Sequence, residues 1–173
     1  MRLLFEIDKK DYDPNGTAFI RPSARAIIIK DKKLAVIYSN KQKCYQIPGG
    51  GIESGEDPIE AMIREGKEEA GLEVIRETVR EFGYVHRIQR GKHEPVFIQD
   101  NYYYLCEVSD TQVPTSYSEN EKADEFEPVF VSIENAIETN ELYARENSYD
   151  SMIERELRVM RIVQKEILND GAY

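Results

Sequence analysis

The stretch from Gly50 to Leu72, GGIESGEDPIEAMIREGKEEAGL, places a glycine turn before a short helix rich in glutamate. Asp57 is a preferred N-cap residue, Pro58 suits the first helical position, and Gly71 is typical of the residue after a helix end. The sequence therefore predicts a helix over about residues 58–70. A glycine turn leading into an acidic helix fixes both where the backbone bends and where carboxylates gather.

The same helix collects three glutamates at one border of its apolar face. With about 100° between successive residues, the apolar stripe comprises Ile59, Met62, Ile63, Gly66 and Ala70. Glu69 falls at the edge of this stripe, and Glu65 and Glu68 lie within about 100° of it. Glu65 and Glu69 are four residues apart and repel each other, and a hard divalent cation between them would reverse that cost. Oxygen ligands of this kind are those that Mg²⁺ prefers.

Eight positions in this stretch fit one known pattern. They are Gly50, Glu56, Arg64, Glu65, Glu68, Glu69, Gly71 and Leu72. The pattern resembles the Nudix box, the signature of hydrolases that cleave nucleoside diphosphates linked to another moiety. The resemblance implies an α/β (α+β) fold, a Nudix-type α/β/α sandwich with a mixed sheet. It also implies hydrolysis of the diphosphate (pyrophosphate) linkage of a nucleoside diphosphate-linked or nucleoside triphosphate substrate, with Mg²⁺ as cofactor and Mn²⁺ as an alternative.

The resemblance assigns the metal site and the catalytic residues. Glu65, Glu68 and Glu69 correspond to the metal ligands, and a backbone carbonyl of Gly49 or Gly50 can join the metal shell. Glu65 or Glu68 is the expected general base, since a carboxylate beside a metal-bound water is well placed to accept a proton. The sequence does not choose between the two, and it leaves the number of metal ions open.

Two further positions of the pattern have structural interpretations. Glu56 and Arg64 correspond to a brace that ties the turn to the helix. Gly66 departs from the pattern, which has an aliphatic residue there. Glycine inside a helix costs roughly 1 kcal/mol relative to alanine, and we expect it to allow closer packing of the helix on the sheet.

The whole chain, residues 1–173, is expected to form one domain. Apolar periodicity predicts strands over residues 2–8, 24–29, 34–39, 95–108 and 128–132, and one or two strands over residues 72–84. Further helices are predicted over residues 133–139 and 149–168. The polar segments 87–94 and 109–127 are predicted to be loops.

Residues outside the acidic helix are the candidates for binding substrate. Arg25 begins a β-rich run and is the best candidate for a phosphate contact. Weaker candidates are Arg21, Arg87, Arg90, Lys92 and His93. Tyr102 and Tyr104 share one face of a predicted strand and are candidates for stacking on a base. Some Nudix relatives take a catalytic base from a loop beyond the box, where this chain has Glu119, Glu121 and Glu125.

The composition limits the kinds of molecule that the chain is expected to bind. The chain has 33 acidic and 23 basic residues and a net charge of −10, which argues against binding to nucleic acid or to an anionic membrane. The expected partner is a small nucleotide or another diphosphate compound, and the family resemblance adds a possible homodimer. Two cysteines, Cys44 and Cys106, and the lack of a signal peptide at the N-terminus are typical of a reduced, cytoplasmic protein.

Two other functions remain open at this stage. One is a non-catalytic Nudix-fold module that binds or senses a nucleotide, although such domains usually lose glutamates that this chain keeps. The other is a diphosphate isomerase of the same fold, which needs a catalytic cysteine; Cys44 lies six residues before Gly50. Sugar nucleotides, ADP-ribose, dinucleoside polyphosphates, oxidised nucleoside triphosphates and non-nucleotide diphosphates are all compatible substrates.

Overall fold

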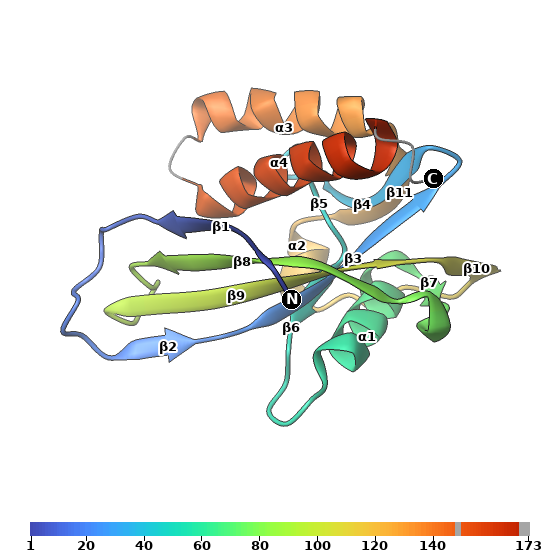
Figure 1. Ribbon diagram of the computed structural model, residues 1–173. Helices are drawn as coiled ribbons and strands as arrows, with labels where there is room; N and C mark the ends of the chain where they lie inside the picture. Colours follow the sequence, from blue (N-terminus) through green and yellow to red (C-terminus); the bar gives the residue numbers. More distant parts are fainter. Residues whose placement is uncertain (148–149, 170–173) are drawn as a thin grey trace.

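The computed structural model of the protein describes residues 1–147 and 150–169. A mixed sheet lies between two helical layers, with α1 on one face and α3 and α4 on the other (Figure 1). The predicted α/β/α sandwich is therefore confirmed. No helix within the described residues is both long enough and apolar enough to cross a membrane.

Most of the secondary-structure elements are strands. The strands are β1 Leu3–Asp8, β2 Ala18–Ile20, β3 Ser23–Lys30, β4 Lys33–Ser39, β5 Cys44–Gln46, β6 Gly49–Gly51, β7 Leu72–Val74, β8 Arg80–Gln89, β9 Val96–Cys106, β10 Val108–Gln112 and β11 Phe126–Val131. The helices are α1 Pro58–Ala70, α2 Glu119–Ala123, α3 Ile133–Glu146 and α4 Ser151–Val163, with a 3₁₀ turn Arg76–Thr78 and a π-helix Gln164–Asn169.

The main sheet has the strand order β1-β8-β9-β3-β4-β11 and includes β2, β5 and β6 beside this path. Strands β1 and β8, β2 and β9, and β3 and β9 pair in parallel, whereas the other pairs of this sheet are antiparallel. β7 and β10 form a separate antiparallel pair. The mixture of directions follows from the long connections between paired strands, which allow parallel neighbours.

The sheet divides where the chain enters α1. β3 and β4 pair with each other only beside their turn, at Ile29–Leu34 and Lys30–Lys33. Beyond that point β6 pairs with β3 and β5 pairs with β4, so the two strands separate. The glycines predicted to form a turn are instead the short strand β6, which pairs with β3 beside α1 where β3 and β4 separate.

The two faces of the sheet have separate cores. On one face Ile27 and Tyr103 pack with Ile133 and Met160 of the helices α3 and α4. On the other face Ala24, Ala26, Ile28 and Tyr104 pack with Met62 of α1. Alternation along β3 and β9 therefore decides which helical layer each side chain meets.

Several sequence-based boundaries differ from the structure. The segment 72–84, predicted as one or two strands, forms two strands separated by the 3₁₀ turn, whereas the predicted loop 87–94 is wrong at its start because β8 continues to Gln89. The predicted loop 109–127 contains part of β10, all of α2 and the start of β11, and α3 continues to Glu146. The last helix was expected from Tyr149, which lies outside the described residues; α4 begins at Ser151.

Candidate active site

The helix α1 has the limits that its end residues predict. The Asp57 side chain accepts hydrogen bonds from the backbone N–H groups of Ile59 and Glu60, and Pro58 occupies the first turn. The helix ends at Gly71, which has a left-handed conformation with φ of 64°. These caps fix the register of the helix, and with it the direction of each glutamate.

Glu65 lies with its carboxylate against Gly50 of β6. Its side chain is 13% exposed, and a Cβ atom added to Gly50 would lie 2.4 Å from the carboxyl carbon of Glu65. Burial raises the pKa of Glu65, while the neighbouring Arg64 opposes that rise. Only glycine at position 50 leaves room for this carboxylate, which is a steric reason for the glycine of the motif.

Arg64 brings together several acidic groups of the turn and the helix. Its Nε and Nη2 donate to the two carboxylate oxygens of Glu56 at 2.9 and 3.1 Å, and Nη2 also donates to the carbonyl of Gly51 at 3.1 Å. Its Nη1 donates to Glu65 at 2.8 Å and to Glu68 at 3.3 Å. The structure thus joins the two residues expected to form the brace. Arg64 also faces the carboxylates of Glu65 and Glu68.

Glu69 is the most enclosed acidic group of the helix. The residue is 8% exposed, and its Oε2 accepts a hydrogen bond from the backbone N–H of Gly49 at 2.8 Å. Burial raises the pKa of Glu69 to about 8; the Gly49 N–H and Arg25 oppose this, and the charges of Glu65 and Glu121 add to it. Burial makes it costly to ionise this carboxyl group on its own. A nearby cation would stabilise its ionised form.

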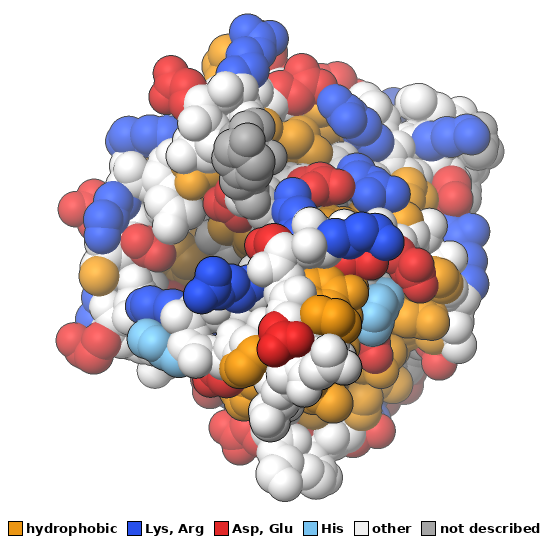
Figure 2. Space-filling view, turned by 90° about the vertical axis from the view of Figure 1, so that its left-hand side faces the viewer, with side chains coloured by type: hydrophobic (Ala, Val, Ile, Leu, Met, Phe, Trp, Pro, Cys, Tyr) orange, Lys and Arg blue, Asp and Glu red, His pale blue; other side chains and the backbone are white. Residues whose placement is uncertain are grey.

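A pocket of about 200 Å³ opens beside these groups, where β3 and β4 separate. Its lining includes Glu69, the glycines of β6, Arg21, Arg25, Gln99 and Glu121. Seen from the side that carries the β8–β9 turn, the molecule has a mixed surface, with Lys, Arg, Asp and Glu side chains around a hollow (Figure 2). Carboxylates and guanidinium groups therefore line one pocket.

Of the three loop glutamates considered from the sequence, Glu121 lines this pocket. It lies in the short helix α2, where its carboxylate accepts a hydrogen bond from the backbone N–H of Ser118 at 2.6 Å. Its charge raises the pKa of both Glu65 and Glu69. This long-range approach of α2 to α1 gives no local signal in the sequence.

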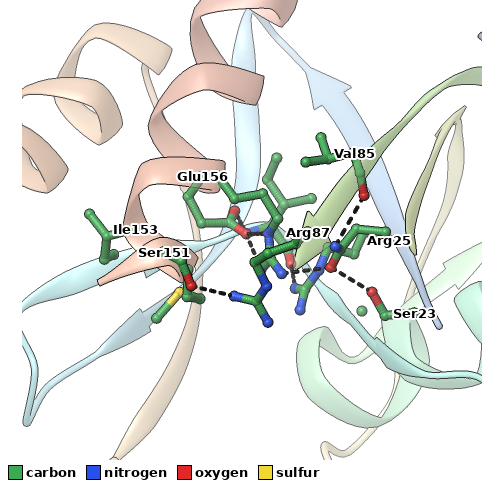
Figure 3. Close-up of polar contacts among 12 residues, drawn as sticks. Ser23, Arg25, Val85, Arg87, Ser151, Ile153 and Glu156 are labelled. Carbon is green, nitrogen blue, oxygen red and sulfur yellow. Dashed lines mark hydrogen bonds and ion pairs between the residues drawn. The ribbon is translucent and has the colours of Figure 1, made fainter. Parts of the chain in front are cut away.

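Arg25 and Arg87 lie close together between the sheet and α4 (Figure 3), and the charge of Arg155 acts on both. Arg25 of β3, Arg87 of β8 and Arg155 of α4 are all buried. Arg155 forms an ion pair with Glu156 at 2.6 Å, and it also donates to Asn101 at 2.6 Å. Arg155 and Glu156 were absent from the sequence-based candidates, although Glu156 lies at helical spacing within the apolar stripe of α4.

Arg25 and Arg87 make fewer contacts. Arg25 donates through Nη1 to the carbonyl of Ile47 at 2.7 Å. Arg87 donates to Ser151 at 3.1 Å and to Gln99 at 2.6 Å. Arg87 had been placed in a surface loop, and the structure instead buries it in β8 because that strand pairs with β9 up to Gln89.

The two tyrosines expected to stack on a base lie elsewhere. Tyr104 is 5% exposed and packs in the core beneath α1. Tyr102 packs against the same core and lies beside Tyr84, with 5.9 Å between the ring centroids. Neither residue lines the pocket, because they are on the sheet face opposite Arg25. Tyr103 is the residue of this run that faces the arginines.

Within residues 1–147 and 150–169, no three His, Cys, Asp or Glu side chains are arranged so that they could hold a metal ion together. Arg64 joins Glu65 and Glu68, and Glu69 is turned toward the Gly49 N–H. The three predicted ligands are thus on adjacent turns of one helix, but only Glu69 lines the pocket. Glu68, with a side chain 44% exposed, has the most freedom to turn.

Both cysteines are free and buried. Burial raises the pKa of Cys44 to about 12, and the charges of Asp150, Glu156 and Asp124 add to the rise. Burial likewise raises the pKa of Cys106 to about 12. Neither thiol is a nucleophile at neutral pH, which argues against the isomerase alternative for Cys44.

Comparisons with known proteins agree with this geometry. A model of the NUDIX domain matches residues 20–154. An RNA pyrophosphohydrolase from a Nitratiruptor species is 38% identical over 76 residues, which cover 44% of this chain and 47% of that protein. The match therefore spans about half the length of this curated relative.

Solved structures share the fold. A mutator MutT protein from Bacillus halodurans has a TM-score of 0.55 and 16% identity, covering 69% of this chain and 72% of that one. A MutT NUDIX hydrolase from Burkholderia pseudomallei has a TM-score of 0.53 and 20% identity, covering 67% of this chain and 85% of that one. At such identities the similarity is one of architecture.

Proposed function

The chain belongs to the NUDIX family, and from this premise we propose that it is a Mg²⁺-dependent hydrolase of a diphosphate linkage. The observation that carries the proposal is that the buried Glu69 lines a pocket together with Arg21 and Arg25, while the half-buried Glu65 lies one turn away on the same helix. Acidic groups at one end suit a divalent cation, and guanidinium groups suit phosphate oxygens. A nucleotide or another small diphosphate compound is the proposed substrate.

We propose that residues of α1 hold a divalent metal ion with their side chains turned away from the present partners, Arg64 and the Gly49 N–H. Glu65, Glu68 and Glu69 would hold it, together with a carbonyl of Gly49 or Gly50, and Mn²⁺ would be an alternative to Mg²⁺. The space beside Gly50 that admits the Glu65 carboxylate, and the raised pKa of Glu69, support this assignment. When bound, the metal supplies charge stabilisation to phosphate oxygens and lowers the pKa of a coordinated water.

The chain itself supplies positioning and proton transfer. Glu56 and Arg64 hold the turn against α1 through two hydrogen bonds, which keeps the glycines next to the carboxylates. Glu65 or Glu68 is the proposed general base, and Glu121 is a third candidate because its carboxylate lines the pocket from α2. Glu69 is proposed as a ligand rather than a base, because one of its oxygens already accepts the Gly49 N–H.

A turnover assay with matched variants tests the proposal. Purified protein is incubated with Mg²⁺ or with chelator and a panel of diphosphate compounds, and the products are separated by anion exchange. We expect metal-dependent cleavage that falls by at least about 10²-fold in Glu69→Gln. The matched control is Glu73→Gln, which makes the same change at a glutamate of β7, outside the pocket lining.

Two results would contradict the proposal. Near-normal turnover by Glu69→Gln would remove Glu69 from the metal site. Saturable binding of a nucleotide without turnover of any compound would instead favour the non-catalytic sensing module.

A further inference from the structure

The buried arginines carry more positive charge than the structure neutralises. Glu156 pairs with Arg155, and its second oxygen accepts the backbone N–H of Ile47 at 2.8 Å. Within the described parts of the chain, neither Arg25 nor Arg87 forms an ion pair with a carboxylate. This excess is unexpected in a protein with a net charge of −10.

Hydrogen-bond donors in the same cluster also lack partners. Among the described residues, the buried Nε of Arg25, the buried Nε of Arg87 and the hydroxyl of Tyr103 have no hydrogen-bond partner. Buried donors are almost always paired, and leaving one unpaired costs about 1–3 kcal/mol. Three such donors in one place indicate a site built for acceptor atoms that the chain does not supply.

The electrostatic state of the arginines agrees with this. Burial lowers the pKa of Arg25, and the charge of Arg155 lowers it further. Burial also lowers the pKa of Arg87 to about 9, with Arg155 and Arg25 adding to the effect. A bound anion would relieve both the desolvation and the mutual repulsion of these groups.

The cluster opens into the pocket along one strand face. Arg21, Ser23 and Arg25 alternate along β3 and its entrance and line the pocket together, with Gln99 of β9 next to them. The Arg21 guanidinium lies over Gly51, where an added Cβ would be 3.0 Å from its Nε. Arg87 is behind this surface and reaches it through its hydrogen bond to Gln99.

The shape of the pocket limits what enters it. Phe126 is the aromatic residue among those lining it, so there is no pair of rings to enclose a base. Its volume is only about 200 Å³. A terminal phosphate carries close to two negative charges at neutral pH, because its second pKa is about 6, whereas a bridging phosphate carries one.

We propose that Arg21, Arg25 and Gln99, supported by Arg87, form a subsite that binds the terminal phosphate of the substrate. The inference rests on the proposed function in placing this phosphate next to the metal ligands of α1. It narrows the substrate class to compounds that end in a phosphate group, such as a nucleoside triphosphate or a 5′-triphosphorylated RNA end. Compounds in which both phosphates are substituted, such as ADP-ribose, lack the group that this subsite recognises.

The first test measures binding without metal. Inorganic pyrophosphate is titrated into the protein in the presence of chelator by calorimetry. We expect saturable binding that weakens by about tenfold or more in Arg25→Met and in Arg21→Met, with Arg25→Lys between these and the unmodified protein. Arg161→Met is the matched control, since Arg161 pairs with Glu141 on the helical layer and should bind pyrophosphate normally.

Folding of the variants is checked by thermal melting. Arg25→Met removes a charge that burial and Arg155 disfavour, so its melting temperature should not fall. Arg21 is exposed, so Arg21→Met provides a second variant that keeps the core unchanged. Equal pyrophosphate affinity in folded Arg25→Met, or no binding by the unmodified protein, would overturn the proposal.

The second test measures turnover with Mg²⁺ on ATP, a 5′-triphosphorylated oligoribonucleotide and ADP-ribose. Arg25→Met should raise KM about tenfold or more for the compounds with a terminal phosphate, and the better of the two identifies the source of that phosphate. An equal effect on ADP-ribose would refute terminal-phosphate recognition. If no compound is cleaved but pyrophosphate binding still depends on Arg25, the subsite stands and the hydrolase assignment fails.

Discussion

Adding one methyl group at Gly50 should disable the site without unfolding the protein. A Cβ atom at this position would lie 2.4 Å from the carboxyl carbon of Glu65 and 2.5 and 2.6 Å from its two oxygens. The colliding atoms are the end of a flexible side chain, so Glu65 can turn away. In Gly50→Ala the backbone therefore stays, and the carboxylate leaves its place against β6.

The size of the effect follows from the distances. Ordinary contacts to a Cβ atom begin at about 3.4 Å, so the Glu65 carboxylate must move by about 1 Å. A displacement of about 1 Å at a catalytic site can lower the rate by about 10²-fold. We therefore expect kcat/KM of Gly50→Ala to fall about 100-fold, whereas the free energy of unfolding should change by less than about 1 kcal/mol.

The assay compares Gly50→Ala with Gly66→Ala. Both variants add one methyl group within the same motif, but a Cβ at Gly66 would meet only Val74 Cγ2, at 3.9 Å. Initial rates with Mg²⁺ are measured on the best substrate, and melting temperature is measured by calorimetry. Gly66→Ala should keep its activity, so a loss confined to Gly50→Ala isolates the displacement of Glu65.

Two results would refute this reasoning. Full activity in Gly50→Ala would show that Glu65 does not need its present position. A melting temperature lowered by more than about 4 °C, which corresponds to more than about 1 kcal/mol for a chain of this size, would show that the backbone and not the carboxylate had yielded.

Three further predictions concern stability and reactivity. Gly66→Ala should stabilise the protein by about 1 kcal/mol through helix propensity, measured by urea unfolding; a loss of stability would show tighter packing against β7. The pKa of Glu69 is about 8 in the folded protein, against an ordinary value of 4.5. Between these two pH values, the free energy of unfolding of the metal-free protein should therefore fall by about 1.4 kcal/mol for each unit that the pH rises. Glu69→Gln should lack this contribution, and parallel pH profiles of the two proteins would exclude it. Cys44 and Cys106, both buried with a pKa of about 12, should react with a thiol reagent at pH 8 only at the rate of unfolding; rapid labelling of the native protein would contradict this.

Local chemistry explains why α1 was predicted to its last residue. Asp57, Pro58 and Gly71 act on the backbone within one turn of the helix ends. The helical angle likewise identified Glu69 as the carboxylate nearest the buried stripe, and it is 8% exposed. The expectation for Gly66 was wrong, because the helix leaves room for a methyl group there; helix–sheet distance is not encoded in one residue.

Pairing between distant segments explains what the sequence could not provide. Arg87 is buried because β8 pairs with β9 beyond the polar residues that suggested a loop. Alternation correctly separated Tyr103 from its neighbours, but it could not say which face meets the pocket. The sequence predicts the helix over residues 149–168 but not the role of Glu156 within it. A charged residue at the spacing of buried apolar residues is the signal that a buried partner such as Arg155 exists.

The pocket holds an acidic group and a basic group close together without pairing them. Arg25 lowers the pKa of Glu69, but burial still raises that pKa to about 8, and Arg25 itself remains without an ion pair in the part of the chain that the structure describes. The reason is that the two groups are held by different partners: Glu69 by the Gly49 N–H and Arg25 by the Ile47 carbonyl. A direct ion pair would stabilise the empty protein and would have to break before a ligand entered. Separate carboxylate and guanidinium ends instead leave each free for a partner of opposite charge, and a phosphate chain carrying a divalent cation presents both partners in one ligand.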